Sequence, residues 1–389
     1  MTARHGQHLA RWLLVIVTFL IVYGSLYPFR FAAGGDRGIL ELVGTLSWAR
    51  TTPSDIAANV LLYLPFGACL GWMLAVRLGG PLAVLAATVA GVLLSTTIEV
   101  AQIFETRRVA SLADVCFNGT GSLAGSVLAL ALRSARHGFR RHPLTALLAE
   151  PIATALLFLW VGYRLAPFAV TLDPAHWREA VKPLGSGWLD PVATVGYLVP
   201  WLVVAQALRA LLGGRDPARP LALLMLGMLV ALVVVSGKAL APAELVAMVL
   251  ALAVNRPLSR LAPSRSALLV CWVLAALIVF RGTAPFDFRL DPGAFGLVPF
   301  RDAMLRYRAA NLLDMFEKCF QYGALVWLLA RSGAGVLAAT VIACALVLGV
   351  ELLQAWLPGQ PAEITDPLLV VAAGALIAVF DNPAPGRGR

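Results

Sequence analysis

Residues 84–102 read "VLAATVAGVLLSTTIEVAQ", and residues 336–354 read "VLAATVIACALVLGVELLQ". Both segments are free of charge until a glutamate near the end, which a glutamine follows three positions later. A helix needs about 20 apolar residues to cross a bilayer. The two segments therefore predict two related membrane-spanning helices, each with a polar pair close to its last turn.

The composition of the whole chain is also typical of a membrane protein. Of its 389 residues, 60% are hydrophobic and only 13% are charged, whereas soluble domains contain about 25% charged residues. Further uncharged runs cover residues 12–28 and 56–76. Because a backbone that crosses lipid must satisfy its hydrogen bonds internally, these runs predict helices. We therefore expect an all-α, polytopic integral membrane protein.

Short motifs recur along the chain and indicate an internal repeat. An apolar run ends with a Pro-Phe pair in "GSLYPFRF" (24–31), "YRLAPFAV" (163–170) and "RGTAPFDF" (281–288). After each of these motifs an aspartate opens the next apolar run, and these residues are Asp55, Asp190 and Asp314.

The apolar runs divide into three copies of a four-helix unit. The spacing from Glu99 to Asp114 equals the spacing from Glu351 to Asp366, which aligns the first copy with the third. Because each copy has an even number of spans, the copies are parallel repeats with about twelve transmembrane helices in total. The predicted copies cover residues 10–135, 150–255 and 266–381.

Basic residues indicate the orientation of the chain in the membrane. Arginines collect at both termini and in the short loops around Arg77, Arg209–Arg219 and Arg331, with few acids beside them. Cytoplasmic loops of membrane proteins concentrate basic residues. We therefore expect both termini in the cytoplasm and the Pro-Phe motifs at the outer face. This distribution accounts for the formal net charge of +10, so no nucleic-acid partner is predicted.

Three long segments at the expected outer face, residues 30–54, 168–189 and 286–313, mix Leu, Trp and Phe with charged residues. Segments of this composition can lie in the plane of the membrane interface. Ordinary solvated loops are the alternative interpretation.

The sequence indicates neither a metal site nor a cofactor. The five cysteines lie inside apolar runs and lack the C-x-x-C spacing. Four of the five histidines lie in basic segments, and His176 stands alone. We therefore predict that the chain binds neither a metal ion nor a cofactor.

Polar residues gather where the third and fourth helices of the first copy meet. Glu99 and Gln102 are three positions apart and so share a helix face. Asp114 and Asn118 are four positions apart at the start of the next helix. Charged groups at membrane depth are costly unless they are paired or line a wet cavity. We therefore predict an outward-opening ligand site formed by Asp55, Asn59, Glu99, Gln102, Arg107, Arg108, Asp114 and Asn118.

The third copy keeps part of this pattern. Lys318 replaces Asn59 and predicts an ion pair with Asp314 one turn away. Val370 stands in place of Asn118, and in the middle copy Glu244 stands for the aspartate while the Glu-Gln pair is missing. The first copy thus carries the intact motif. The counterparts in the third copy are Asp314, Lys318, Glu351, Gln354 and Asp366.

These residues also have structural interpretations. "TPSD" (52–55) and "SLAD" (111–114) are capping boxes, and "TDP" (365–367) resembles an N-cap, so each aspartate can satisfy backbone N–H groups at a helix start. For Glu99, an ion pair with one of the two neighbouring arginines is the alternative to a functional role. Residues that can simply join neighbouring helices are Gln102, Asn118, Gly119, Gly121 and Gly125.

The first copy resembles the VanZ-like family, named for a protein linked to resistance against the glycopeptide teicoplanin. The resemblance rests on "DIAANVLLYLPFG", "IEVAQ" and "RRVASLADVCFNGTGSLAG"; it is clearest at residues 55–132, with a partial second match at 314–380. Family members often carry another acid three positions before Asp114, where this chain has Ser111. The resemblance implies a bacterial cell-envelope protein of the cytoplasmic (inner) membrane and does not supply a reaction.

Three functions stay open. In the first, Arg107 and Arg108 hold the phosphate of a lipid-linked glycan or peptidoglycan precursor, because a guanidinium donates two bonds at once; such binding would alter glycopeptide sensitivity. In the second, Glu99 and Asp114 are the catalytic acid and base of a membrane enzyme acting on such a lipid. In the third, the repeats form a transporter or flippase, although the polar groups gather at one face only. The sequence favours the first function, with membrane lipid as the surrounding partner.

Overall fold

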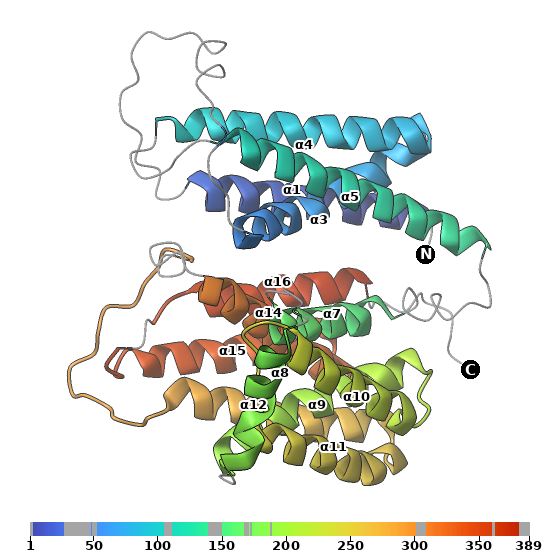
Figure 1. Ribbon diagram of the computed structural model, residues 1–389. Helices are drawn as coiled ribbons and strands as arrows, with labels where there is room; N and C mark the ends of the chain where they lie inside the picture. The colour runs from blue at the N-terminus through green and yellow to red at the C-terminus, as the bar shows by residue number, and fades with distance from the viewer. Residues whose placement is uncertain are drawn as a thin grey trace. The chain divides into compact units, whose positions relative to one another are not determined.

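The computed structural model describes residues 3–26, 48, 53–104, 111–138, 150–166, 171, 173–186, 189–300, 309–359 and 362–380. The regular elements in these ranges are helices, and no strand occurs among them, so the all-α prediction is confirmed there (Figure 1). The chain forms two compact units, Met1–Thr145 and Ala146–Arg389.

Five helices within the described ranges are long and apolar enough to cross a membrane. They are Asn59–Leu78, Gly80–Gln102, Pro191–Leu211, Pro263–Thr283 and Val336–Gln354. Shorter apolar helices, such as Pro151–Leu165 and Ala218–Val234, accompany them. The prediction of a polytopic membrane protein is thus supported by these five helices, whereas twelve spans in three copies stay a prediction.

In its described residues, the first unit contains four long helices: α1 (Ala3–Leu26), α3 (Pro53–Leu78), α4 (Gly80–Gln102) and α5 (Leu112–Gly138). Helix α3 packs against each of the other three, and α4 also packs on α5. Among the described residues, a cluster of larger buried apolar side chains is formed by Ile21, Tyr63, Phe66 and Ile98. Along α4, Leu82, Leu85, Val89 and Leu93 form an exposed apolar face, which suits contact with lipid.

Glycines set the distance between α3 and α5. A Cβ atom at Gly121 would lie 2.3 Å from the Val60 carbonyl oxygen, and one at Gly125 would lie 1.9 Å from the Leu64 carbonyl oxygen. On the facing helix, a Cβ at Gly67 would lie 2.0 Å from the Ser122 carbonyl oxygen. Small residues let membrane helices approach until their backbones touch, so the predicted packing role of these glycines matches their positions.

The second unit contains the remaining helices, most of which run in similar directions, while the short α8 lies across them (Figure 1). Its core is apolar and aromatic; Trp160 and Trp201 meet edge to face with ring centroids 4.5 Å apart. The helices are α7 (Pro151–Leu165), α8 (Pro174–Val181), η1 (Lys182–Ser186), α9 (Pro191–Leu211), α10 (Ala218–Val234), α11 (Pro242–Arg260), α12 (Pro263–Thr283), α14 (Ala309–Arg331), α15 (Val336–Gln354) and α16 (Thr365–Phe380).

The aspartates expected to open apolar runs differ in position. Asp190 caps α9, because its carboxylate accepts from the backbone N–H groups of Val192 and Ala193. Asp314 does not cap a helix, since α14 begins at Ala309 and the residue lies in its second turn. Asp314 therefore opens the apolar run in the sequence, but α14 starts five residues before that run.

Replacing Gly125 by valine is expected to destabilise the first unit, because the new side chain would occupy the position of the Leu64 carbonyl oxygen. Overpacking of this kind costs about 1–3 kcal/mol or more when backbone must move. The thermal unfolding midpoint of the purified protein in detergent would fall. Gly227→Ala in α10 is the matched control, since a Cβ there meets no atom within 4 Å; equal midpoints for the two variants would contradict the expectation.

Candidate functional site

Five of the eight residues predicted for the ligand site of the first copy have described side chains, namely Asn59, Glu99, Gln102, Asp114 and Asn118. Asp55 lies in the first turn of α3, but its side chain is outside the described part of the chain. Arg107 and Arg108 also lie outside the described residues. The phosphate-binding hypothesis for these two arginines therefore stays a prediction.

The Glu99 and Gln102 side chains hold backbone groups of neighbouring segments. Glu99 is 3% exposed, and its Oε2 atom accepts a hydrogen bond of 2.7 Å from the backbone N–H of Ser111, just before α5. The Gln102 Nε2 atom donates to the Ser25 carbonyl oxygen, near the end of α1, at 2.8 Å. The pair thus ties the last turn of α4 to the helices before and after it.

The same two contacts occur in the third copy. The Glu351 Oε2 atom accepts from the backbone N–H of Glu363 at 2.8 Å, and the Gln354 Nε2 atom donates to the Gly282 carbonyl oxygen at 3.1 Å. Gly282 occupies the position of Ser25 in the aligned Pro-Phe motifs. The recurrence of these two contacts in the predicted third copy, where the surroundings differ, favours an architectural role for the Glu and Gln side chains. The signal for it was the recurrence of Glu and Gln where the neighbouring polar residues change.

In the expected capping box of α5, Ser111 caps the helix, whereas Asp114 bonds a side chain of another helix. The Ser111 hydroxyl accepts from the Ala113 backbone N–H at 3.2 Å and so caps α5. The backbone N–H of Ser111, which the fourth residue of a capping box usually bonds, donates to Glu99 instead. Asp114 accepts a hydrogen bond of 2.8 Å from the Asn59 amide and thereby joins α5 to α3.

In the third copy, a charged network takes the place of the Asn59–Asp114 bond. The Lys318 ammonium lies 3.0 Å from Asp366 on α16 and 3.7 Å from Asp314 on its own helix. The Tyr322 hydroxyl donates to the other Asp366 oxygen at 2.5 Å. The ion pair expected from sequence is present, but the nearer partner of Lys318 is on another helix. Asp366 accordingly serves helix packing, and Thr365 accepts from Phe300 N–H rather than capping α16.

The middle copy joins its helices by yet another pair. Glu244, at the start of α11, is buried and forms an ion pair with Arg164 at the end of α7. The Arg164 guanidinium also lies 5.1 Å from the ring centroid of Tyr197. In each of the three predicted copies, the acid near the start of the last helix therefore bonds a side chain of an earlier helix.

One polar pair in the first copy has no such architectural counterpart. The Asn118 amide donates to the Ser95 hydroxyl at 2.9 Å, between α5 and α4. The Asn118 Oδ1 and Ser122 Oγ atoms are buried and have no hydrogen-bond partner among the described residues. The positions of Ser95 and Asn118 are held in the third copy by Val347 and Val370, which are both buried. Sequence reasoning missed Ser95, although its replacement by valine in the third copy was a visible signal.

In the described part of the chain, no group of three or more His, Cys, Asp or Glu side chains is placed to hold a metal ion. The chemistry available there is hydrogen bonding by amides, hydroxyls and carboxylates.

In the described residues the regular elements are helices, several of them are long and apolar enough to cross a bilayer, and polar side chains are buried at one end of the first unit; these features support an integral membrane protein. Residues 12–133 match the model of the family described as VanZ/LLP1. This match confirms the VanZ-like resemblance and extends it over α1, while the partial second match at 314–380 stays a prediction. Comparisons with curated proteins and with solved structures gave no match.

Truncating the shared glutamates tests their architectural role. Glu99→Ala and Glu351→Ala each leave a backbone N–H without its acceptor, which costs about 1–3 kcal/mol when the group is buried. We expect both variants to unfold at lower temperature in detergent. Glu99→Gln and Glu351→Gln keep an acceptor oxygen and should lose less. If the alanine variants were as stable as the wild type, the two hydrogen bonds would not hold the helices together.

Proposed function

We propose that this chain is a VanZ-like membrane protein of the bacterial cell envelope that binds the polar head of a lipid-linked envelope precursor at the outer leaflet. The observation that carries the proposal is the Ser95–Asn118 pair, which is buried between α4 and α5 with an unused acceptor on Asn118. Through this binding the protein would modulate sensitivity to glycopeptides.

Packing alone does not require that pair. The third copy fills the same two positions with valines, and replacing both partners of a buried hydrogen bond by apolar groups can be nearly neutral for stability. A buried amide oxygen without a partner is costly. Retaining Ser95 and Asn118 therefore makes sense if a ligand supplies a donor, such as a sugar hydroxyl or a peptide N–H.

Asp114 and Asn118 lie one turn apart near the start of α5, where both bond neighbouring helices. Asn118 lies one turn deeper than Asp114, and Asp114 reaches Asn59 on α3. Arg107 and Arg108 come just before α5 in the sequence, and we propose that they supply the cations for a phosphate. A head group with hydroxyls or amides beyond a phosphate would match that order of groups.

The cytoplasmic membrane, with both termini in the cytoplasm, is the proposed location of the protein.

A membrane enzyme is the second candidate, in which Glu99 and Asp114 exchange protons with the lipid. It ranks lower because the Glu99 Oε2 atom accepts from the Ser111 backbone, a contact that Glu351 repeats in the third copy. A transporter or flippase ranks third, because the hydrogen bonds of the polar cluster join helix ends on one side of the first unit only.

The double variant Ser95→Val/Asn118→Val, copied from the third repeat, tests the proposal. We expect its affinity for a fluorescent lipid-linked peptidoglycan precursor to fall by about tenfold or more at a temperature where the variant is folded, as the loss of hydrogen bonds to a ligand predicts. Its unfolding midpoint should fall only modestly, because the buried Tyr63 hydroxyl loses its bond to Ser95. Thr120→Val is the matched control, because Thr120 is exposed on the same helix and bonds only the Cys116 carbonyl oxygen.

The same variants should be introduced into the native host lacking this gene, with teicoplanin sensitivity and precursor levels measured and membrane expression checked. Restoration by Thr120→Val but not by the double variant would support binding through Ser95 and Asn118. Unchanged affinity and full restoration by the double variant would show that the pair is not a ligand site. Accumulation of an altered precursor would favour the enzyme.

A further inference from the structure

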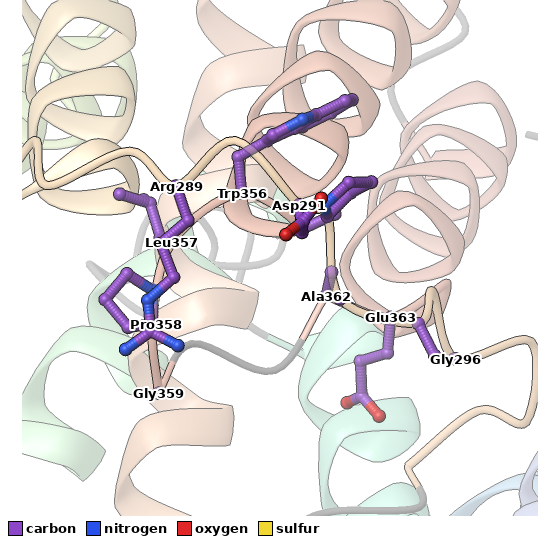
Figure 2. Close-up of a pocket in the computed structure, with 13 residues that line it drawn as sticks. Arg289, Asp291, Gly296, Trp356, Leu357, Pro358, Gly359, Ala362 and Glu363 are labelled. Carbon is purple, nitrogen blue, oxygen red and sulfur yellow. The ribbon is translucent and has the colours of Figure 1, made fainter.

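A second site lies at the end of the second unit where two candidate spans finish. A pocket of about 390 Å³ opens between the segment after α12 and the segment joining α15 to α16 (Figure 2). The spans end at Thr283 and Gln354, and the pocket includes Arg289 and Trp356, a few residues beyond them. Membrane spans end at the boundary of the hydrocarbon core, so spanning by these two helices would place the pocket at the level of the lipid head groups.

Backbone hydrogen bonds hold the two walls of the pocket together. The N–H of Arg289 donates to the Trp356 carbonyl oxygen at 2.8 Å, and the N–H of Gly293 donates to the Ala355 carbonyl oxygen at 2.6 Å. On the far side, the N–H of Gly296 donates to the Ala362 carbonyl oxygen at 2.8 Å. The frame of the pocket is thus formed by the protein itself and needs no ligand to assemble.

Charged groups of both signs line this frame. Figure 2 shows the side chains of Arg289, Asp291 and Glu363 around the pocket. Within the described ranges, none of these three side chains forms an ion pair or hydrogen bond. One guanidinium and two carboxylates complement a ligand that carries a phosphate and an ammonium group.

The surroundings of the pocket are apolar. Leu290 is 98% exposed and Leu297 is 76% exposed, and Phe286, Phe288 and Trp356 are also exposed on the same segments. Large apolar side chains beside charged groups are typical of segments at the boundary between head groups and acyl chains, where tryptophan is enriched. This composition favours a lipid over a water-soluble molecule as the occupant.

We propose that this pocket binds the head group of a phospholipid that carries a primary amine, such as phosphatidylethanolamine. The Arg289 guanidinium bonds the phosphate, and the carboxylates of Asp291 and Glu363 accept from the ammonium group. A phospholipid without an amine places no cation near the two carboxylates, and a quaternary amine has no N–H to donate. The proposal concerns the second unit alone and does not depend on the function proposed for the first.

Delipidated full-length protein in detergent, titrated with single phospholipids and analysed by native mass spectrometry, tests the proposal. We expect phosphatidylethanolamine to bind more tightly than phosphatidylglycerol or phosphatidylcholine. Arg289→Gln and Asp291→Asn/Glu363→Gln should each weaken this binding by about tenfold or more, as loss of a charge-assisted hydrogen bond predicts. Arg265→Gln, at an exposed position at the start of α12, is the control and should bind like the wild type.

Three results would overturn the proposal. The first is equal binding of the three lipids, and the second is wild-type affinity in both pocket variants. The third is displacement of phosphatidylethanolamine by an equal concentration of free phosphoethanolamine, which would assign the pocket to a soluble zwitterion. The unfolding midpoint without lipid should be unchanged in the variants, because the three side chains have no partners within the described part of the protein.

Discussion

The hydrogen bond from the Ser111 backbone to the Glu99 carboxylate, repeated between Glu363 and Glu351, is the contact on which the arrangement of helix ends depends. A short connection joins the third and fourth helices at this point, and the backbone N–H of Ser111 at its end is buried. An unsatisfied buried N–H is costly, so a carboxylate within the last turn of the preceding helix fixes where the next helix starts. The glutamine three residues later, Gln102 or Gln354, donates to a carbonyl oxygen near the end of the first helix and so joins that helix to the same contact.

The predicted copies differ in the residues around this contact. The comparison separates residues that join helices from residues that are candidates for a ligand site. Asn59, Lys318 and Arg164 are chemically different, yet each bonds the acid at the start of the fourth helix. This contact is therefore a way of joining helices in an apolar environment, where a polar side chain needs a partner. Ser95 and Asn118 are different, because the third copy dispenses with both. A ligand site is better sought at such a position than at the most acidic one.

The two proposed sites use the same physical opportunity at different places. At the ends of membrane-spanning helices the surroundings change from hydrocarbon to water, so charged and apolar side chains can lie next to each other. In the first unit the polar groups extend inward along α5, which suits a head group inserted between helices. In the second unit Arg289, Asp291 and Glu363 line a rim outside the spans, which suits a lipid that remains in its leaflet.

The sequence by itself indicated the helical class, the membrane environment and the VanZ-like character of the first copy. These features are visible in it because uncharged runs and short motifs are formed by residues that are close together along the chain. It also identified the residues of the polar cluster. Only the tertiary structure decided their partners: Glu99 with a backbone N–H, Lys318 with Asp366, and Asn118 with Ser95. The physical reason is that a side chain's spacing defines its helix face, whereas its hydrogen-bond partner depends on how closely and in which direction the neighbouring helix packs.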